Sequence, residues 1–139
     1  MKAVDTNVLV YAFDSTEPAK RARALALIDG LVRTPGSALL LWQTAVEFLC
    51  CLRRWQSGGR ISATDVEAYT AEMLSYFPLA VPSAAVISRS LQLTMRYSLS
   101  HWDSVLVAAA IDAGIVQLYS EDLQDGASYD GLIVTNPFT

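Results

Sequence analysis

The sequence has few of the residues on which most enzyme chemistry depends. Its 139 residues include one histidine, His101, and two cysteines, Cys50 and Cys51. A zinc site needs about four His, Cys or carboxylate ligands, and His101 has no such partner at ligand spacing. No nucleophile-elbow motif accompanies His101, as a Ser-His-Asp hydrolase would require. The only pair of adjacent glycines, Gly58-Gly59, follows a predicted helix, which argues against a phosphate-binding loop. Any catalysis therefore has to rest on carboxylates.

Long apolar runs are also missing, and charged residues are few. Only 17% of the residues are charged and 53% are hydrophobic, which excludes a disordered chain. The longest uncharged segment, residues 73–88, is interrupted by Pro78 and Pro82, and a membrane-spanning helix needs about 20 apolar residues. The N-terminus lacks the basic and apolar segments of a secretory signal, so we expect a cytoplasmic protein with reduced cysteines.

The order of the remaining segments predicts an α/β fold with a mainly parallel sheet, because apolar strands alternate with helices. Strands are expected over residues 3–4, 38–41, 79–81, 115–119 and 132–134. Helices are expected over residues 8–12, 19–32, 42–56, 62–76, 83–96 and 102–113. No internal repeat or linker interrupts this pattern, so residues 1–139 are predicted to form one domain.

The charge is unevenly distributed along the chain. The net charge is −4, from 10 basic and 14 acidic residues. The segment from Lys20 to Arg60 nevertheless carries seven basic and two acidic residues, a local net charge of +5, and the remainder carries −9. A molecule polarised in this way can bind a polyanion despite its negative total charge.

Two acidic residues follow predicted strands. Asp5 follows the first strand and Asp122 follows the strand over residues 115–119. Ligands of open α/β sheets bind beyond the carboxyl ends of the strands, so both positions are candidates for a site. The alternative for Asp5 is a helix N-cap, and the alternative for Asp122 is an ordinary turn residue.

Two further acidic residues lie on helices. Asp103 has apolar neighbours at helical spacing, and a buried carboxylate needs a cation, hydrogen-bond donors or a proton. Its alternative is a favourable position near a helix N-terminus. Glu47 is the only acid on its helix, and its alternative is a solvated ion pair with Arg53 or Arg54.

Together these four acids suggest a site for a hard cation. Clustered carboxylates raise one another's pKa unless a divalent cation lies between them. Mg²⁺ and Mn²⁺ prefer such oxygen ligands, and they support phosphodiester hydrolysis by stabilising the charge that develops on the phosphate while an oriented water attacks.

The motifs around these acids resemble those of the PIN-domain family along essentially the whole chain. They are Val4-Asp5-Thr6-Asn7-Val8-Leu9, Glu47, His101-Trp102-Asp103 and Ser120-Glu121-Asp122-Leu123-Gln124-Asp125-Gly126. The closing Asn136-Pro137-Phe138 is similar to small single-domain members, the VapC-type toxins of type II toxin–antitoxin pairs.

The resemblance implies a three-layer α/β/α sandwich and a metal-dependent endoribonuclease that uses Mg²⁺ or Mn²⁺. It assigns the catalytic and metal-binding roles to four acids, Asp5, Glu47, Asp103 and Asp122, with Asp125 as a rival for the last position. Supporting roles fall to Thr6, Asn7 and Ser120.

The resemblance also implies partners, namely an RNA substrate, a cognate antitoxin protein and a second copy of the chain in a homodimer. Arg53, Arg54 and Arg60 follow Glu47 and are candidates for binding RNA phosphates. Their alternative is solvated surface charge.

Two other functions stay open at this point. One is a catalytically inert PIN-like module that binds RNA or protein. The other is an aspartyl-nucleophile phosphatase, which also places an Asp after the first strand. Against the phosphatase, Asn7 stands where a second Asp is needed, and the two lysines, Lys2 and Lys20, both lie early in the chain.

Overall fold

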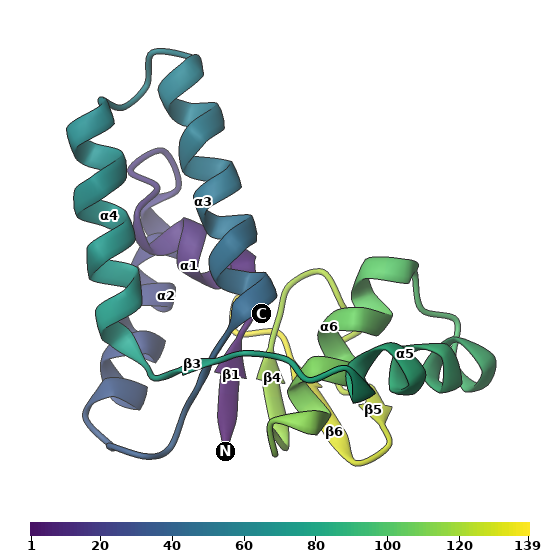
Figure 1. Cartoon of the computed structure of the whole chain (residues 1–139). Helices are drawn as coiled ribbons and strands as arrows, with labels where there is room; N and C mark the ends of the chain where they lie inside the picture. Colours follow the sequence, from purple (N-terminus) through teal and green to yellow (C-terminus); the bar gives the residue numbers. More distant parts are fainter.

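A computed structural model describes all residues of the chain, 1–139, as six helices and six short strands (Figure 1). The helices are α1 (Thr6–Ala12), α2 (Pro18–Val32), α3 (Trp42–Ser57), α4 (Ala63–Tyr76), α5 (Ala85–Arg96) and α6 (His101–Asp112). The strands are β1 (Lys2–Val4), β2 (Leu40–Leu41), β3 (Leu79–Ala80), β4 (Gln117–Tyr119), β5 (Ser128–Tyr129) and β6 (Leu132–Thr135).

The main sheet has four strands in the order β1-β4-β6-β5, and its first three strands are parallel. In the register, Val4 is opposite Tyr119, and Tyr119 is opposite Thr135. The carboxyl ends of β1, β4 and β6 are therefore level, so the residues that follow them, Asp5 and Ser120 among them, emerge at one edge. The parallel pair β2–β3 forms a separate small sheet, and a bridge from Ala38 to Lys2 connects it to β1.

Helices cover both faces of the sheet, which makes the three-layer α/β/α arrangement that the resemblance implies. Figure 1 shows α5 and α6 on one side of the strands and α1 to α4 on the other. Successive strand residues supply the two cores in turn: Ala3 packs with the residues of α5 and α6, and Val4 packs with those of α1 to α4.

Local signals explain where several helices begin and end. Ser62 and Asp65 form a reciprocal capping box at the start of α4. The side chain of Ser100 caps α6, and Pro18 opens α2 in its first turn. Gly114 follows α6 with a φ of 79°, a left-handed conformation that stops the helix at little cost.

The strands differ most from the prediction. The strand expected over residues 38–41 has only two residues, because Ala38 forms just an isolated bridge. The antiparallel strand β5 was not predicted. It pairs with β6 through a two-residue turn in which Asp130 and Gly131 have φ values of 50° and 92°, as a type I′ hairpin requires. None of the six helices combines the length and the apolar character needed to cross a membrane.

Candidate functional site

Asp5 lies directly after β1 and is also the N-cap of α1, so the structural and the functional interpretations of this residue are compatible. One carboxylate oxygen accepts a hydrogen bond from the Thr6 N–H at 2.7 Å, and the other accepts one from the Ser120 hydroxyl at 2.7 Å. The residue is only 5% exposed. Burial raises the pKa of Asp5 to about 6 against the lowering effect of these two hydrogen bonds, and the charges of Asp122 and Glu47 also raise it.

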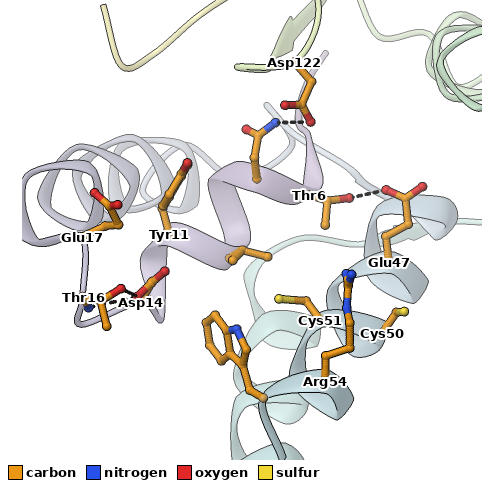
Figure 2. Close-up of a pocket in the computed structure, with 13 residues that line it drawn as sticks. Thr6, Tyr11, Asp14, Thr16, Glu17, Glu47, Cys50, Cys51, Arg54 and Asp122 are labelled. Carbon is orange, nitrogen blue, oxygen red and sulfur yellow. Dashed lines mark hydrogen bonds between the residues drawn. The ribbon is translucent and has the colours of Figure 1, made fainter. Parts of the chain in front are cut away.

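Glu47 is brought to Asp5 by the packing of α3 against α1. Its carboxylate accepts hydrogen bonds from the Thr6 hydroxyl at 2.7 Å and from the Gln43 amide at 3.0 Å. Figure 2 shows Thr6 and Glu47 facing each other across the gap between the two helices. The predicted alternative, an ion pair with a neighbouring arginine of α3, does not form.

Asp122 reaches the same edge of the sheet from the loop after β4. The Ser120 hydroxyl accepts hydrogen bonds from the Asp122 N–H at 3.1 Å and the Leu123 N–H at 3.4 Å, which fixes the turn. The Asn7 amide of α1 donates to the Asp122 carboxylate at 3.1 Å. Asp125 is engaged elsewhere, because its carboxylate accepts the Asn136 N–H at 2.8 Å. Of the two rivals, Asp122 is the one next to Asp5.

Asp103 lies in the first turn of α6, half-buried rather than enclosed by the apolar face. Its N–H donates to the Ser100 hydroxyl at 3.3 Å, so the helix-capping interpretation describes its backbone. The Gln43 amide, which also contacts Glu47, donates to the Trp102 carbonyl at 3.2 Å. The start of α6 is therefore held beside α3, but Asp103 is not among the charges that shift the pKa of Asp5.

The donor chemistry of this edge fits a hard divalent cation. The side chains are oxygen donors, and neutral groups such as Thr6, Asn7 and Ser120 contact the carboxylates where lysine or arginine could have neutralised them. The pKa of Asp5 is raised mainly by burial and to a smaller extent by the charges of Asp122 and Glu47, and a cation bound at this edge would lower it. No three His, Cys, Asp or Glu side chains lie close enough together to hold a metal between them, and Mg²⁺ usually takes one or two carboxylates and several waters.

A cleft of about 560 Å³ opens beside these acids, between α1, the α1–α2 loop and α3. Thr6, Asn7, Glu47 and Asp122 line one part of it. Further along, Cys50, Cys51 and Arg54 line it from α3 (Figure 2). Both cysteines are free, and burial raises the pKa of the Cys51 thiol. The only arginine at this cleft is Arg54, two helical turns after Glu47 on the same face of α3.

The other two arginines predicted to bind RNA do not line this cleft, although Asp14 and Trp55, which Arg60 contacts, do. Arg53 diverges from Arg54 by about 100° around the helix and lines a neighbouring pocket with Val46 and Leu49, which Arg54 also borders. Arg60 forms an ion pair with Asp14, and its guanidinium carbon lies 4.0 Å from the centre of the Trp55 ring. The structure therefore brings one of the three candidate arginines to the acidic site.

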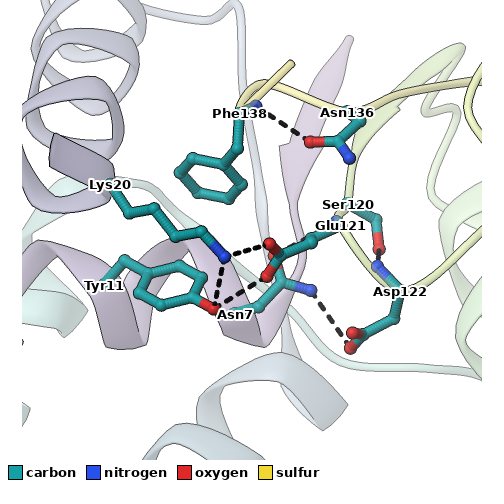
Figure 3. A network of polar contacts seen from close by, with 8 residues as sticks. All are labelled: Asn7, Tyr11, Lys20, Ser120, Glu121, Asp122, Asn136 and Phe138. Carbon is teal, nitrogen blue, oxygen red and sulfur yellow. Dashed lines mark hydrogen bonds and ion pairs between the residues drawn. The ribbon is translucent and has the colours of Figure 1, made fainter. Parts of the chain in front are cut away.

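A second polar cluster adjoins the site, where its member Tyr11 also lines the cleft, and the sequence did not reveal it. Lys20 of α2 forms an ion pair with Glu121, and the Tyr11 hydroxyl also donates to Glu121 (Figure 3). These hydrogen bonds lower the pKa of Glu121 although partial burial raises it. Glu121 is 101 residues from Lys20, so no local pattern reveals the pair.

The family is decided by a match to the PIN domain model over residues 2–124. The chain belongs to the PIN-domain family. This confirms the resemblance drawn from the motifs around the four acids, and it agrees with the observed three-layer fold.

Solved structures similar to this PIN-domain chain include a toxin–antitoxin complex from Klebsiella pneumoniae. That chain is 22% identical with a TM-score of 0.72, and the match covers 99% of this chain and 98% of the other. VapBC2 from Rickettsia felis, bound to a DNA fragment from its promoter, is 14% identical with a TM-score of 0.71 and 97% coverage of both chains.

A third similar structure is VapC20 from Mycobacterium tuberculosis, described as a toxin that cleaves the sarcin-ricin loop. It is 17% identical with a TM-score of 0.66, covering 88% of this chain and 90% of the other. No match to a curated protein was found. At these identities the neighbours establish the fold of this PIN-domain chain.

Proposed function

We propose that this PIN-domain protein is a Mg²⁺- or Mn²⁺-dependent endoribonuclease and acts as the toxin of a toxin–antitoxin pair. The observation that carries the proposal is the environment of Asp5. This carboxylate is buried at the carboxyl end of the sheet, near Glu47 and Asp122, and no basic side chain contacts it. A buried carboxylate near other acids is unfavourable when it is ionised, and a bound divalent cation removes this penalty.

In this proposal Asp5, Glu47, Asp103 and Asp122 hold the cation, which when bound would stabilise negative charge on the phosphate under attack. The protein's own groups orient the acids. The Ser120 hydroxyl fixes Asp5, and the Thr6 hydroxyl fixes Glu47. Arg54 lies along the same cleft, where its guanidinium would bind a neighbouring phosphate of the RNA.

The proposed partners are an antitoxin protein and a second copy of the chain. The Klebsiella and Rickettsia neighbours are toxin–antitoxin assemblies, which supports an antitoxin for a chain of the same fold. An outward apolar stripe on α5 supports the homodimer. Ile87, Leu91 and Met95 recur at four-residue spacing and are 75%, 63% and 79% exposed.

RNA cleavage by the purified protein tests the proposed activity. We expect cleavage with Mg²⁺ or Mn²⁺, none with EDTA, and recovery when the metal is restored. Asp5→Asn and Asp103→Asn should each lower the rate of cleavage by about a hundredfold, because each replaces a negatively charged ligand of the cation by a neutral amide. Asp29→Asn is the matched control, since Asp29 is exposed and pairs only with Arg33 on the surface of α2.

Two results would contradict this assignment. Cleavage at the wild-type rate by folded Asp5→Asn protein would remove Asp5 from the chemistry. RNA binding without cleavage in any divalent metal would instead support the inert binding module.

A further inference from the structure

The loop that presents Asp122 is held from outside the acidic site. Its neighbour Glu121 accepts a hydrogen bond from the Tyr11 hydroxyl at 2.8 Å and forms an ion pair with Lys20. The Lys20 ammonium also donates to the Tyr11 hydroxyl at 3.1 Å. Figure 3 shows the Glu121 carboxylate turned toward Tyr11 and Lys20 while Asp122 turns the other way.

The aromatic ring of Phe138 closes this cluster. It meets the Tyr11 ring edge-to-face, with 5.0 Å between ring centres. The Lys20 ammonium lies 4.7 Å from the centre of the Tyr11 ring and 5.8 Å from that of Phe138. Two rings and a carboxylate therefore fix the position of one lysine.

The same C-terminal turn holds the far end of the loop. The Phe138 N–H donates to the Asn136 side chain at 2.8 Å, and the Asn136 N–H donates to the Asp125 carboxylate at 2.8 Å. The loop from Ser120 to Asp125 is thus held at three points. Ser120 bonds to Asp5, Glu121 pairs with Lys20, and Asp125 bonds to Asn136.

Asn7 connects this cluster to the acidic site. Its side-chain carbonyl accepts the Glu121 N–H at 3.3 Å, and its amide group donates to the Asp122 carboxylate at 3.1 Å. A shift of Glu121 therefore also changes where Asp122 points. The ion pair with Lys20 also neutralises Glu121, which would otherwise add a negative charge next to Asp122 in the loop.

We propose that Lys20, Tyr11, Glu121 and Phe138 form a positioning cluster that sets Asp122 for the divalent cation. The inference rests on the proposed function, because it assigns these residues a part in building that metal site. None of the four is assigned to hold the cation or contact RNA. They act through the loop, as the outer partners of a metal ligand do.

Calorimetric titration of Mn²⁺ into the RNA-free protein tests the cluster. Lys20→Met keeps the apolar stem and removes the ion pair, and we expect about tenfold weaker Mn²⁺ binding. Lys20→Arg should retain most of the affinity. Arg33→Met is the matched control, because it also removes one positive charge and one ion pair, with Asp29, on the exposed surface of α2.

Two additional measurements separate positioning from general stability. Urea unfolding identifies any variant that is not folded, in which case Glu121→Gln, which keeps the shape of the side chain, replaces Lys20→Met with the same expected loss. Amide hydrogen exchange at Asp122 and Leu123 should be faster in the folded variant, because these N–H groups bond to Ser120 within the loop.

The outcomes distinguish the two proposals. If wild type binds Mn²⁺ and the folded Lys20→Met or Glu121→Gln protein binds it equally well, the positioning cluster is wrong and the proposed function stands. If wild type binds no Mn²⁺, the proposed function itself fails, and the positioning role fails with it.

Discussion

Asp5 and Asp14 lie at opposite ends of α1, and burial disfavours the ionised form of both. The pKa of Asp5 nevertheless ends at about 6, while that of Asp14 ends below its ordinary value. Two causes differ between the two acids: burial raises the pKa of Asp5 more strongly, and the partners of the two carboxylates are of different charge. Asp14 accepts hydrogen bonds from Thr16 and from the Arg60 guanidinium, and Asp5 has only neutral donors and two acidic neighbours. A carboxylate paired with a cation stabilises the fold, whereas Asp5 is left available for a cation from solution.

Asp14 should therefore make stability depend on pH with a definite sign. Its pKa is lower in the folded chain than the ordinary 3.8, so its contribution is present above that pH and is lost as the pH falls through the lowered value. We expect Asp14→Asn to lower the free energy of unfolding at pH 7 by about 1.5–3 kcal/mol, the scale of a hydrogen bond to a charged group.

Urea unfolding at pH 7, 5 and 3 measures this effect. The difference between wild type and Asp14→Asn should shrink toward pH 3, because below the ordinary pKa of 3.8 the unfolded chain takes up the proton before the folded chain does. Asp29→Asn serves as the control, because its pair with Arg33 is exposed and should be worth less than about 1 kcal/mol. An equal difference at pH 7 and pH 3 would show that the Asp14 charge is not responsible.

The places of Asp5 and Asp122 at one edge of the sheet were predictable from the sequence, but the contacts of the acids were not. Asp5 and Asp122 could be chosen because each follows a predicted strand, and parallel strands end at a common edge. The hydroxyl of Thr6 and the amide of Asn7 contact residues 41 and 115 positions away, and only the packing of α1 against α3 and the β4 loop brings them together.

Helix α3 carries an acidic and a positively charged residue of the proposed site, Glu47 and Arg54, on one face. Arg54 lines the cleft with Glu47, whereas Arg53 does not line this cleft but a neighbouring pocket that Arg54 also borders. We expect Arg54→Ala to raise the KM for RNA about tenfold through the loss of one charge-assisted phosphate contact. Arg53→Ala should leave KM unchanged.

Steady-state cleavage of a short RNA by the two variants checks this prediction, with thermal unfolding as a control for stability. Both arginines lie on one helix and carry the same charge, so a long-range charge effect would act on the two alike. Equal increases in KM would therefore favour general attraction over a contact from Arg54.

The helices were easier to predict than the strands for a physical reason. Helix signals such as Ser62, Pro18 and Gly114 act within one turn and are visible in the sequence. Strands of two to four residues depend on partners far along the chain. β5 exists only because the Asp130-Gly131 turn returns it to β6, and its two residues carry no periodic pattern of their own.

Across the whole molecule, the folded chain changes the meaning of the basic segment between Lys20 and Arg60. Three of its charges are in ion pairs: Lys20 pairs with Glu121, Arg33 with Asp29, and Arg60 with Asp14. Part of the local positive charge is therefore neutralised in ion pairs that attach α2 and the α3–α4 turn to other parts of the fold. Arg54 is the basic residue of this segment that lines the acidic cleft.

The stripe on α5 supplies the last prediction, which concerns assembly. The buried face of α5 uses Val86 and Leu93, so Ile87, Leu91 and Met95 project from the opposite side and contribute little to the core. In a two-fold homodimer the same patch meets itself, so a charge at its centre is opposed by its own copy.

We expect wild type to have the mass of two chains in light scattering, and Leu91→Glu to have the mass of one. Leu74→Glu, on α4 and 48% exposed, is the matched control and should stay dimeric. A wild-type monomer would rule out the homodimer, and a dimeric Leu91→Glu protein would place its interface on another surface than α5.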